Sequence, residues 1–88
     1  MPRYIIERNV GRISEEELQA VGRKSNAVLD DMRDVRWIRS YISHAEGKIY
    51  CEYDAPSIKA ILEHARRVGI PADKVSEVSL EVSPEMFR

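Results

Sequence analysis

The sequence contains almost none of the short motifs that mark covalent, redox or phosphate chemistry. Its 88 residues include one cysteine, Cys51, which cannot form an internal disulfide and therefore fits a reducing compartment. There is no glycine-rich phosphate loop, no nucleophile elbow, and no pair of histidines spaced by one helical turn. A site in this protein must therefore be assembled from residues that are distant in the sequence.

Net charge and long apolar segments are also lacking. Fourteen basic and fifteen acidic side chains leave a net charge of -1, so no general field attracts nucleic acid or an anionic membrane. No apolar run approaches the ~20 residues that span a bilayer, and Met1-Pro2-Arg3 carries no apolar signal core. We expect a soluble cytoplasmic protein that binds neither nucleic acid nor membrane.

What the sequence does contain is a regular order of secondary-structure patterns. Alternating apolar residues predict strands and apolar residues at helical spacing predict helices. The expected strands are 4–7, 35–42, 48–53 and 75–82, and the expected helices are 14–32 and 56–68. This order predicts a single ferredoxin-like βαββαβ domain over residues 1–88. Such an α+β domain has a four-stranded antiparallel sheet with two helices on one face.

The alternation within the strands then divides the sheet residues between two faces. The helix-facing side is expected to receive Tyr4, Ile6, Ile38, Ile42, Ile49 and Cys51. The opposite side, called the open face below, is expected to receive Ile5, Glu7, Trp37, Arg39, Tyr41, Tyr50, Glu52, Glu77 and Glu81. Large aromatics mixed with four carboxylates and an arginine predict an interface that encloses a polar pocket.

Each candidate site residue can be interpreted as a functional residue or as an ordinary structural residue. The open-face carboxylates could bind a divalent cation or supply a general base, or they could form a solvated face with Arg39 as an ion-pair partner. His64 borders the apolar stripe of its helix, where it is either a metal ligand or an edge histidine bonded to backbone. Cys51 suits a small core residue better than a nucleophile, because neither neighbour supplies a base.

Several segments along the whole chain resemble a known family. They are Val35 to Tyr41, Tyr50-Cys51, Ala55-Pro56, His64-Ala65, Gly69, Pro71-Ala72-Asp73 and Glu77-Val78. With these the chain resembles a bacterial family of small ferredoxin-like proteins of unknown function that includes a nickel-binding protein. The resemblance implies a homodimer of the dimeric α/β-barrel type, paired through the open faces. It also implies a divalent transition metal such as nickel, although Ile70 stands where the nickel-binding relatives tend to carry histidine.

Two functions therefore remain open, beside a purely structural dimer module. The first is metal binding by His64 with Glu52 and Glu77, joined by Cys51. The second is a small-molecule-binding or small enzyme module of the dimeric-barrel type. Its ligand-binding residues are expected to be Trp37, Arg39, Tyr41, Tyr50 and Glu7.

Overall fold

The computed structural model describes residues 1–88 and contains the expected elements in the expected order. They are β1 (Arg3–Asn9), α1 (Glu15–Asp30), β2 (Arg36–Ser43), β3 (Lys48–Asp54), α2 (Ile58–Val68) and β4 (Lys74–Glu77). A short 3-10 turn, η1 (Pro84–Phe87), follows near the C-terminus. The predicted succession of strands and helices is confirmed.

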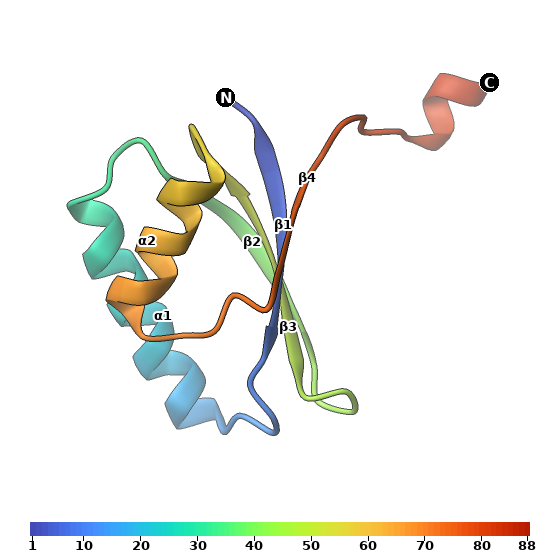
Figure 1. Cartoon of the computed structure of the whole chain (residues 1–88). Coiled ribbons are helices and arrows are strands. Elements are labelled where there is room, and N and C mark those ends of the chain that lie inside the picture. The colour runs from blue at the N-terminus through green and yellow to red at the C-terminus, as the bar shows by residue number, and fades with distance from the viewer.

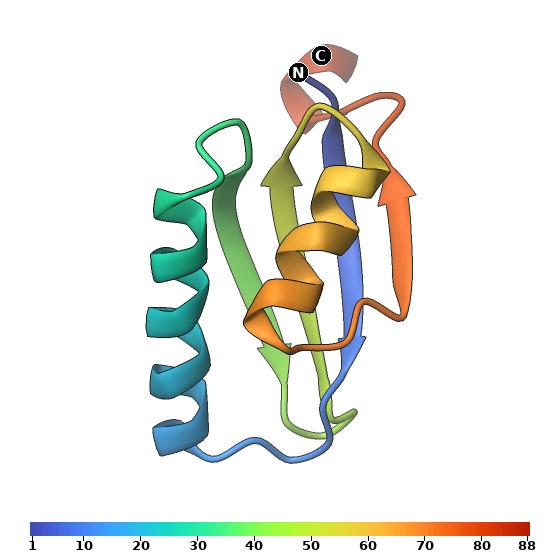
Figure 2. The same ribbon diagram turned by 60° about the vertical axis from the view of Figure 1, so that its left-hand side comes forward.

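The four strands form one antiparallel sheet in the order β2-β3-β1-β4, with both helices on the same side (Figure 1). The fold is therefore ferredoxin-like. Helix α2 crosses the middle of the sheet, whereas α1 lies toward the β2 edge (Figure 2). Neither helix has the length and apolar character that crossing a membrane requires.

The helix ends are fixed by local side-chain and backbone chemistry. Ser14 accepts a hydrogen bond from the backbone of Glu17, and the Glu17 side chain accepts one from the backbone of Ser14. This reciprocal pair satisfies two free N–H groups at the start of α1, as the sequence predicts. Helix α2 ends at Gly69, whose φ of 84° is the left-handed conformation that glycine adopts without steric cost.

The hydrophobic core lies between the central strands and α2. Its buried members include Tyr4, Ile6, Ile49 and Tyr53 from the sheet and Ile61 from α2. Helix α1 contributes less, since Ser25 is its one fully buried residue. The uneven packing leaves space between the N-terminal half of α1 and the sheet.

A bulge in β2 changes the face to which Trp37 belongs. Trp37 pairs with Tyr53 and Arg39 pairs with Glu52, so Ile38 is an extra residue between them. An extra residue reverses the alternation on one side of the bulge. Trp37 therefore lies on the helix-facing side, stacked 6.4 Å from the Tyr53 ring. Its predicted position on the open face is wrong.

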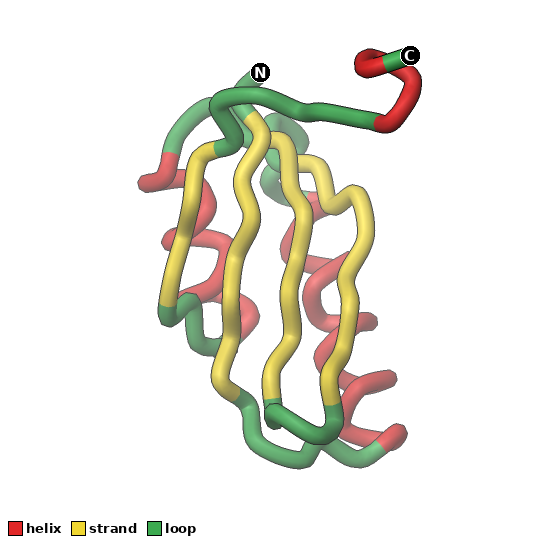
Figure 3. The backbone as a smooth tube through the Cα atoms, turned by 90° about the vertical axis from the view of Figure 1, so that its right-hand side faces the viewer, coloured by secondary structure: helices red, strands yellow, loops and turns green.

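Strand β4 is shorter than predicted, and its residues face the opposite sides of the sheet from those expected. It ends at Glu77, which pairs with the helix-facing Tyr4, so the predicted open-face position of Glu77 is also wrong. Leu80 and Val82 alternate with polar residues, as inward-facing strand residues do. They nevertheless lie beyond β4 and are exposed. The chain after β4 runs past the open side of the sheet toward η1 (Figure 3).

Candidate functional site: a pocket between α1 and the sheet

A pocket of about 80 Å³ lies between the N-terminal half of α1 and the helix-facing side of the sheet. Helix α1 contributes Leu18, Val21, Gly22 and Ser25 to its walls. The two small residues create the gap, because no atom lies within 4 Å of the position that a Cβ of Gly22 would occupy. The pocket surface is almost entirely apolar.

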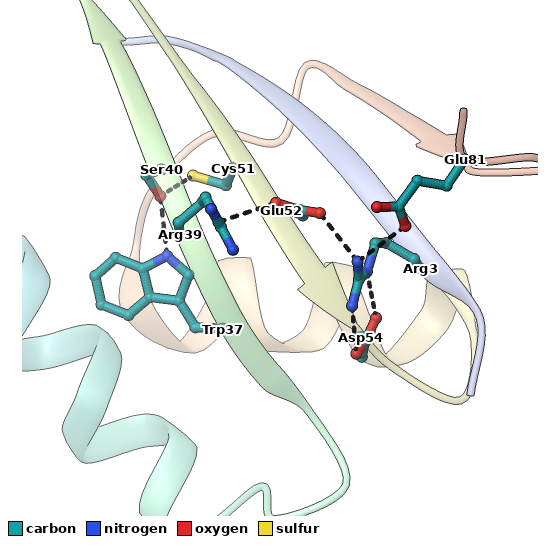
Figure 4. A network of polar contacts seen from close by, with 8 residues as sticks. All are labelled: Arg3, Trp37, Arg39, Ser40, Cys51, Glu52, Asp54 and Glu81. Atoms are coloured by element: carbon teal, nitrogen blue, oxygen red, sulfur yellow. Dashed lines mark hydrogen bonds and ion pairs between the residues drawn. The ribbon is translucent and has the colours of Figure 1, made fainter. Parts of the chain in front are cut away.

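The floor of the pocket carries an ordered chain of polar contacts among the apolar side chains. The Trp37 indole Nε1 donates to Ser40 Oγ at 2.9 Å, and Ser40 Oγ donates to Cys51 Sγ at 3.1 Å (Figure 4). All three residues line the pocket. Cys51 is buried on the helix-facing side, as predicted. The bulge that turns Trp37 inward therefore gives the pocket an aromatic wall.

Arg8, at the end of β1, is the most unusual residue of the pocket. Its side chain is buried, with 1% exposed, and no Asp or Glu forms an ion pair with it. Nε donates to Cys51 Sγ at 3.3 Å and Nη1 donates to the Pro71 carbonyl oxygen at 2.8 Å. The guanidinium also lies 5.9 Å from the Tyr53 ring centroid. Its Nη2 has no hydrogen-bond partner.

Burial without a counter-charge is costly for a guanidinium. Transfer of an ion from water into a protein interior costs several kcal/mol unless other groups compensate. The carbonyl of Pro71 and the ring of Tyr53 each offer partial compensation. One pair of N–H donors nevertheless stays unsatisfied, which is rare for a buried group.

Sequence reasoning missed Arg8, although one signal was available. The alternation that directs Tyr4 and Ile6 toward the helices directs Arg8 to the same side. An arginine in register with core residues predicts either a buried ion pair or a ligand contact.

His64 on α2 is fully buried beside the same group of residues, not at the edge of the helix stripe. Its Nε2 lies 3.1 Å from Ser25 Oγ, while its Nδ1 has no partner. The ring lies 5.3 Å from that of Tyr53. Burial, with a smaller contribution from the charge on Arg8, lowers the pKa of His64 from 6.5 to about 4. The imidazole is therefore neutral at physiological pH.

The open face carries a network of ion pairs. Arg3 pairs with Glu52 and Asp54 at 3.3 and 2.9 Å, and Arg39 pairs with Glu52 at 3.4 Å (Figure 4). The bond from Arg3 is the main cause of a lowered pKa at Asp54. Glu7 likewise pairs with Lys48 at 3.6 Å. These carboxylates already have cationic partners.

The register does place most of the expected ligand-binding residues together on this face. Tyr41 pairs with Tyr50, Arg39 pairs with Glu52, and Glu7 lies beside Tyr50. The pocket itself, however, lies on the other side of the sheet and contains only Trp37 from that predicted set.

The four candidate metal ligands do not converge within one subunit. His64 and Cys51 belong to the helix-facing side, Glu52 to the open face, and Glu77 to the exposed β4 edge. No group of three or more His, Cys, Asp or Glu side chains is arranged to hold a metal ion. Because nickel needs several such donors, the residues of a single subunit do not fit it.

The comparisons with known proteins now identify the family. The family model described as nickel responsive protein SCO4226-like matches residues 4–78. The chain belongs to this family. The crystal structure of SCO4226 from Streptomyces coelicolor A3(2) superposes with a TM-score of 0.80 at 27% sequence identity, over 91% of this chain and 99% of that one. No curated protein matches the chain significantly.

Family membership confirms the resemblance stated from the sequence and agrees with the ferredoxin-like fold. The name of the family refers to a response to nickel. The structure of this subunit shows an apolar pocket with a buried arginine.

Proposed function

We propose that this protein binds a small, largely apolar molecule in the pocket between α1 and the sheet. The observation that carries the proposal is an apolar cavity of about 80 Å³ whose lining includes Arg8, a buried polar side chain without complete hydrogen bonding. Apolar cavities with a few convergent polar groups are the usual form of small-molecule sites. A cavity of about 150 Å³ accommodates benzene, so the buried part of the ligand has only a few carbon atoms.

NMR titration of the ¹⁵N-labelled protein with 1-butanol tests this proposal. The chain has one tryptophan, so the indole N–H of Trp37 gives a single resonance that lies at the pocket wall. We expect that resonance and the backbone amides of Ser25 and Ser40 to shift with one common dissociation constant. Shifts confined to residues outside the pocket would contradict the proposal.

Gly22 supplies a matched pair of variants for this titration. Gly22→Leu adds four carbons from the pocket wall, whereas Gly22→Ala adds one and leaves most of the cavity free. Binding of 1-butanol should be lost in Gly22→Leu and retained in Gly22→Ala. Equal binding by both variants would place the butanol elsewhere.

A second proposed function, binding of a divalent transition metal such as nickel, is favoured by the family rather than by the geometry. Since one subunit does not group three ligands, such a site would draw donors from two copies of the chain. Native mass spectrometry of the untagged protein with nickel and then zinc tests this. A dimer with a fixed number of nickel ions supports it, and a protein that stays metal-free at excess nickel contradicts it.

The partner in this proposal is a second copy bound through the open face. Ile5 and Tyr41 on that face are exposed, at 36% and 60%, and Glu52, which pairs with Arg3, lies opposite Ile5 in the sheet. Tyr41→Lys should shift the sedimentation coefficient from dimer to monomer, because it replaces an exposed aromatic ring of the proposed interface with a charge. Leu62→Lys, on the exposed side of α2, is the control and should leave the coefficient unchanged. A monomeric wild type would refute the pairing.

A further inference from the structure

The buried guanidinium of Arg8, which has no ion-pair partner, indicates the chemical class of ligand that the pocket selects. We propose that the ligand is a short-chain organic carboxylate. Its carboxylate binds the Arg8 guanidinium, and its apolar body of a few carbons fills the space between α1 and Trp37. This inference rests on the proposed function, since it concerns the same pocket.

Arg8 has an incomplete set of hydrogen bonds. Two of its three nitrogens have acceptors, namely Cys51 Sγ and the Pro71 carbonyl oxygen, and Nη2 has none. A guanidinium stays charged at all accessible pH values, so deprotonation cannot relieve the missing partner. An acceptor must come from outside the chain, and an anionic acceptor also neutralises the charge.

No carboxylate of the chain forms an ion pair with the Arg8 guanidinium. The carboxylates of Glu7, Glu52 and Asp54 pair with Lys48, Arg3 and Arg39 on the opposite side of the sheet. Strand geometry holds these side chains on the open face, because Glu7 and Arg8 are consecutive residues of β1. Asp73, which follows Pro71 by two residues, accepts a hydrogen bond from the backbone N–H of Asn9 at 2.6 Å and forms no ion pair with Arg8. The carboxylates near Arg8 in the fold are therefore engaged with other partners.

The rest of the pocket is small and apolar. Beside Arg8 the walls are formed mainly by apolar side chains such as Val21, Trp37 and Ile49. A fully polar anion such as inorganic phosphate would lose its hydration against these walls without replacement. In a carboxylate with a short hydrocarbon chain, the carboxylate accepts hydrogen bonds from Arg8 and the hydrocarbon contacts the apolar walls.

Cys51 is an alternative counter-charge in direct contact with the Arg8 guanidinium. Its sulfur accepts from both Arg8 and Ser40, so a thiolate there would neutralise the guanidinium without a ligand. The ultraviolet absorbance of a thiolate at neutral pH, present in wild type and lost in Cys51→Ala, would overturn the proposal. Absence of that absorbance at pH 7 supports it.

The test compares butyrate, 1-butanol and butylamine, which share a chain length and differ in head-group charge. The full-length protein is titrated at 0.15 M salt while the Trp37 indole N–H and the Arg8 Nε–H resonances are followed. We expect butyrate to bind about tenfold or more tightly than 1-butanol, the gain typical of a hydrogen bond to a charged group. Butylamine should bind more weakly than both.

Arg8→Met then isolates the charge, because methionine keeps an unbranched side chain without the guanidinium. The preference for butyrate over 1-butanol should be lost or reversed, because the carboxylate would be buried without a cation, while 1-butanol still binds. Arg33→Met removes an exposed positive charge elsewhere and should leave the preference unchanged. The wild-type ligand series remains decisive if Arg8→Met fails to fold.

The outcomes separate this inference from the proposed function. If 1-butanol binds in the pocket and butyrate binds no better, the pocket is a ligand site and the inference is wrong. If neither molecule shifts a pocket resonance, both proposals fail. If the preference for butyrate persists in Arg8→Met, the carboxylate binds another cation and the assignment to Arg8 is refuted.

Discussion

Lowering the pH should destabilise this protein well above the range in which carboxylates titrate, because His64 is buried as a neutral base. Its pKa falls from 6.5 in the unfolded chain to about 4 in the folded protein. The unfolded chain therefore binds a proton that the folded protein does not. Stability is fully present above pH 6.5 and is lost progressively as the pH falls toward 4.

The size of this loss follows from the two pKa values. One pKa unit corresponds to 1.36 kcal/mol, so the complete difference amounts to about 3 kcal/mol. Between pH 7.5 and pH 5 the expected loss is about 2 kcal/mol. For a domain of this length a loss of that size lowers the melting temperature by roughly 10 °C.

Urea unfolding at pH 7.5 and pH 5 measures the effect, and His64→Gln serves as the reference. Glutamine has no titratable group, so the variant should lose most of the difference between the two pH values. Arg66 and Arg67 both pair with Glu63 and lower its pKa from 4.5 to about 2, so the stability from these pairs is lost only below pH 4.5. The loss of stability from His64 between pH 6.5 and 4 can therefore be distinguished from the loss from Glu63 below pH 4.5.

NMR titration of the His64 ring gives a direct check, with the exposed His44 as a second signal in the same spectrum. The account predicts a His64 transition near pH 4. A transition near 6.5, or an equal pH dependence in His64→Gln and wild type, would refute the reasoning from burial.

Three further predictions concern stability at pH 7. Gly22→Ala should raise the free energy of unfolding by about 1 kcal/mol, because alanine is the better helix former and its Cβ meets no atom within 4 Å. Gly69→Ala should instead lower it by about 1 kcal/mol or more, since φ is 84° there. Ser14→Ala should cost about 1 kcal/mol through loss of the capping box, with exposed Ser79→Ala as a near-neutral control. Urea unfolding tests all three, and equal effects of Gly22→Ala and Gly69→Ala would contradict the conformational argument.

The order of elements and most of their bounds could be predicted from the sequence, because periodicity and capping are local properties. Ser14 with Glu17 predicts the start of α1, and Gly69 predicts the end of α2. The open-face positions of Tyr41 and Glu52 followed from the same alternation. These features depend on residues only a few positions apart.

The pocket could not be predicted in the same way. A one-residue bulge at Ile38 turns Trp37 toward the helices, and no local signal marks that bulge. The incomplete contact of α1 with the sheet depends on Gly22 and Ser25 lying opposite the strands. Such features arise from packing between elements, which a pattern along one chain does not determine.

The most direct test of the central claim, that the space between α1 and the sheet is a ligand site, is an isotope-filtered NOE experiment on the labelled protein with unlabelled butyrate. The account predicts NOEs from the butyrate methyl protons to the side chains of Trp37 and Val21, which form opposite walls of the pocket. NOEs only to exposed apolar residues such as Leu80 and Phe87 would contradict it, because they would show that butyrate binds outside the pocket.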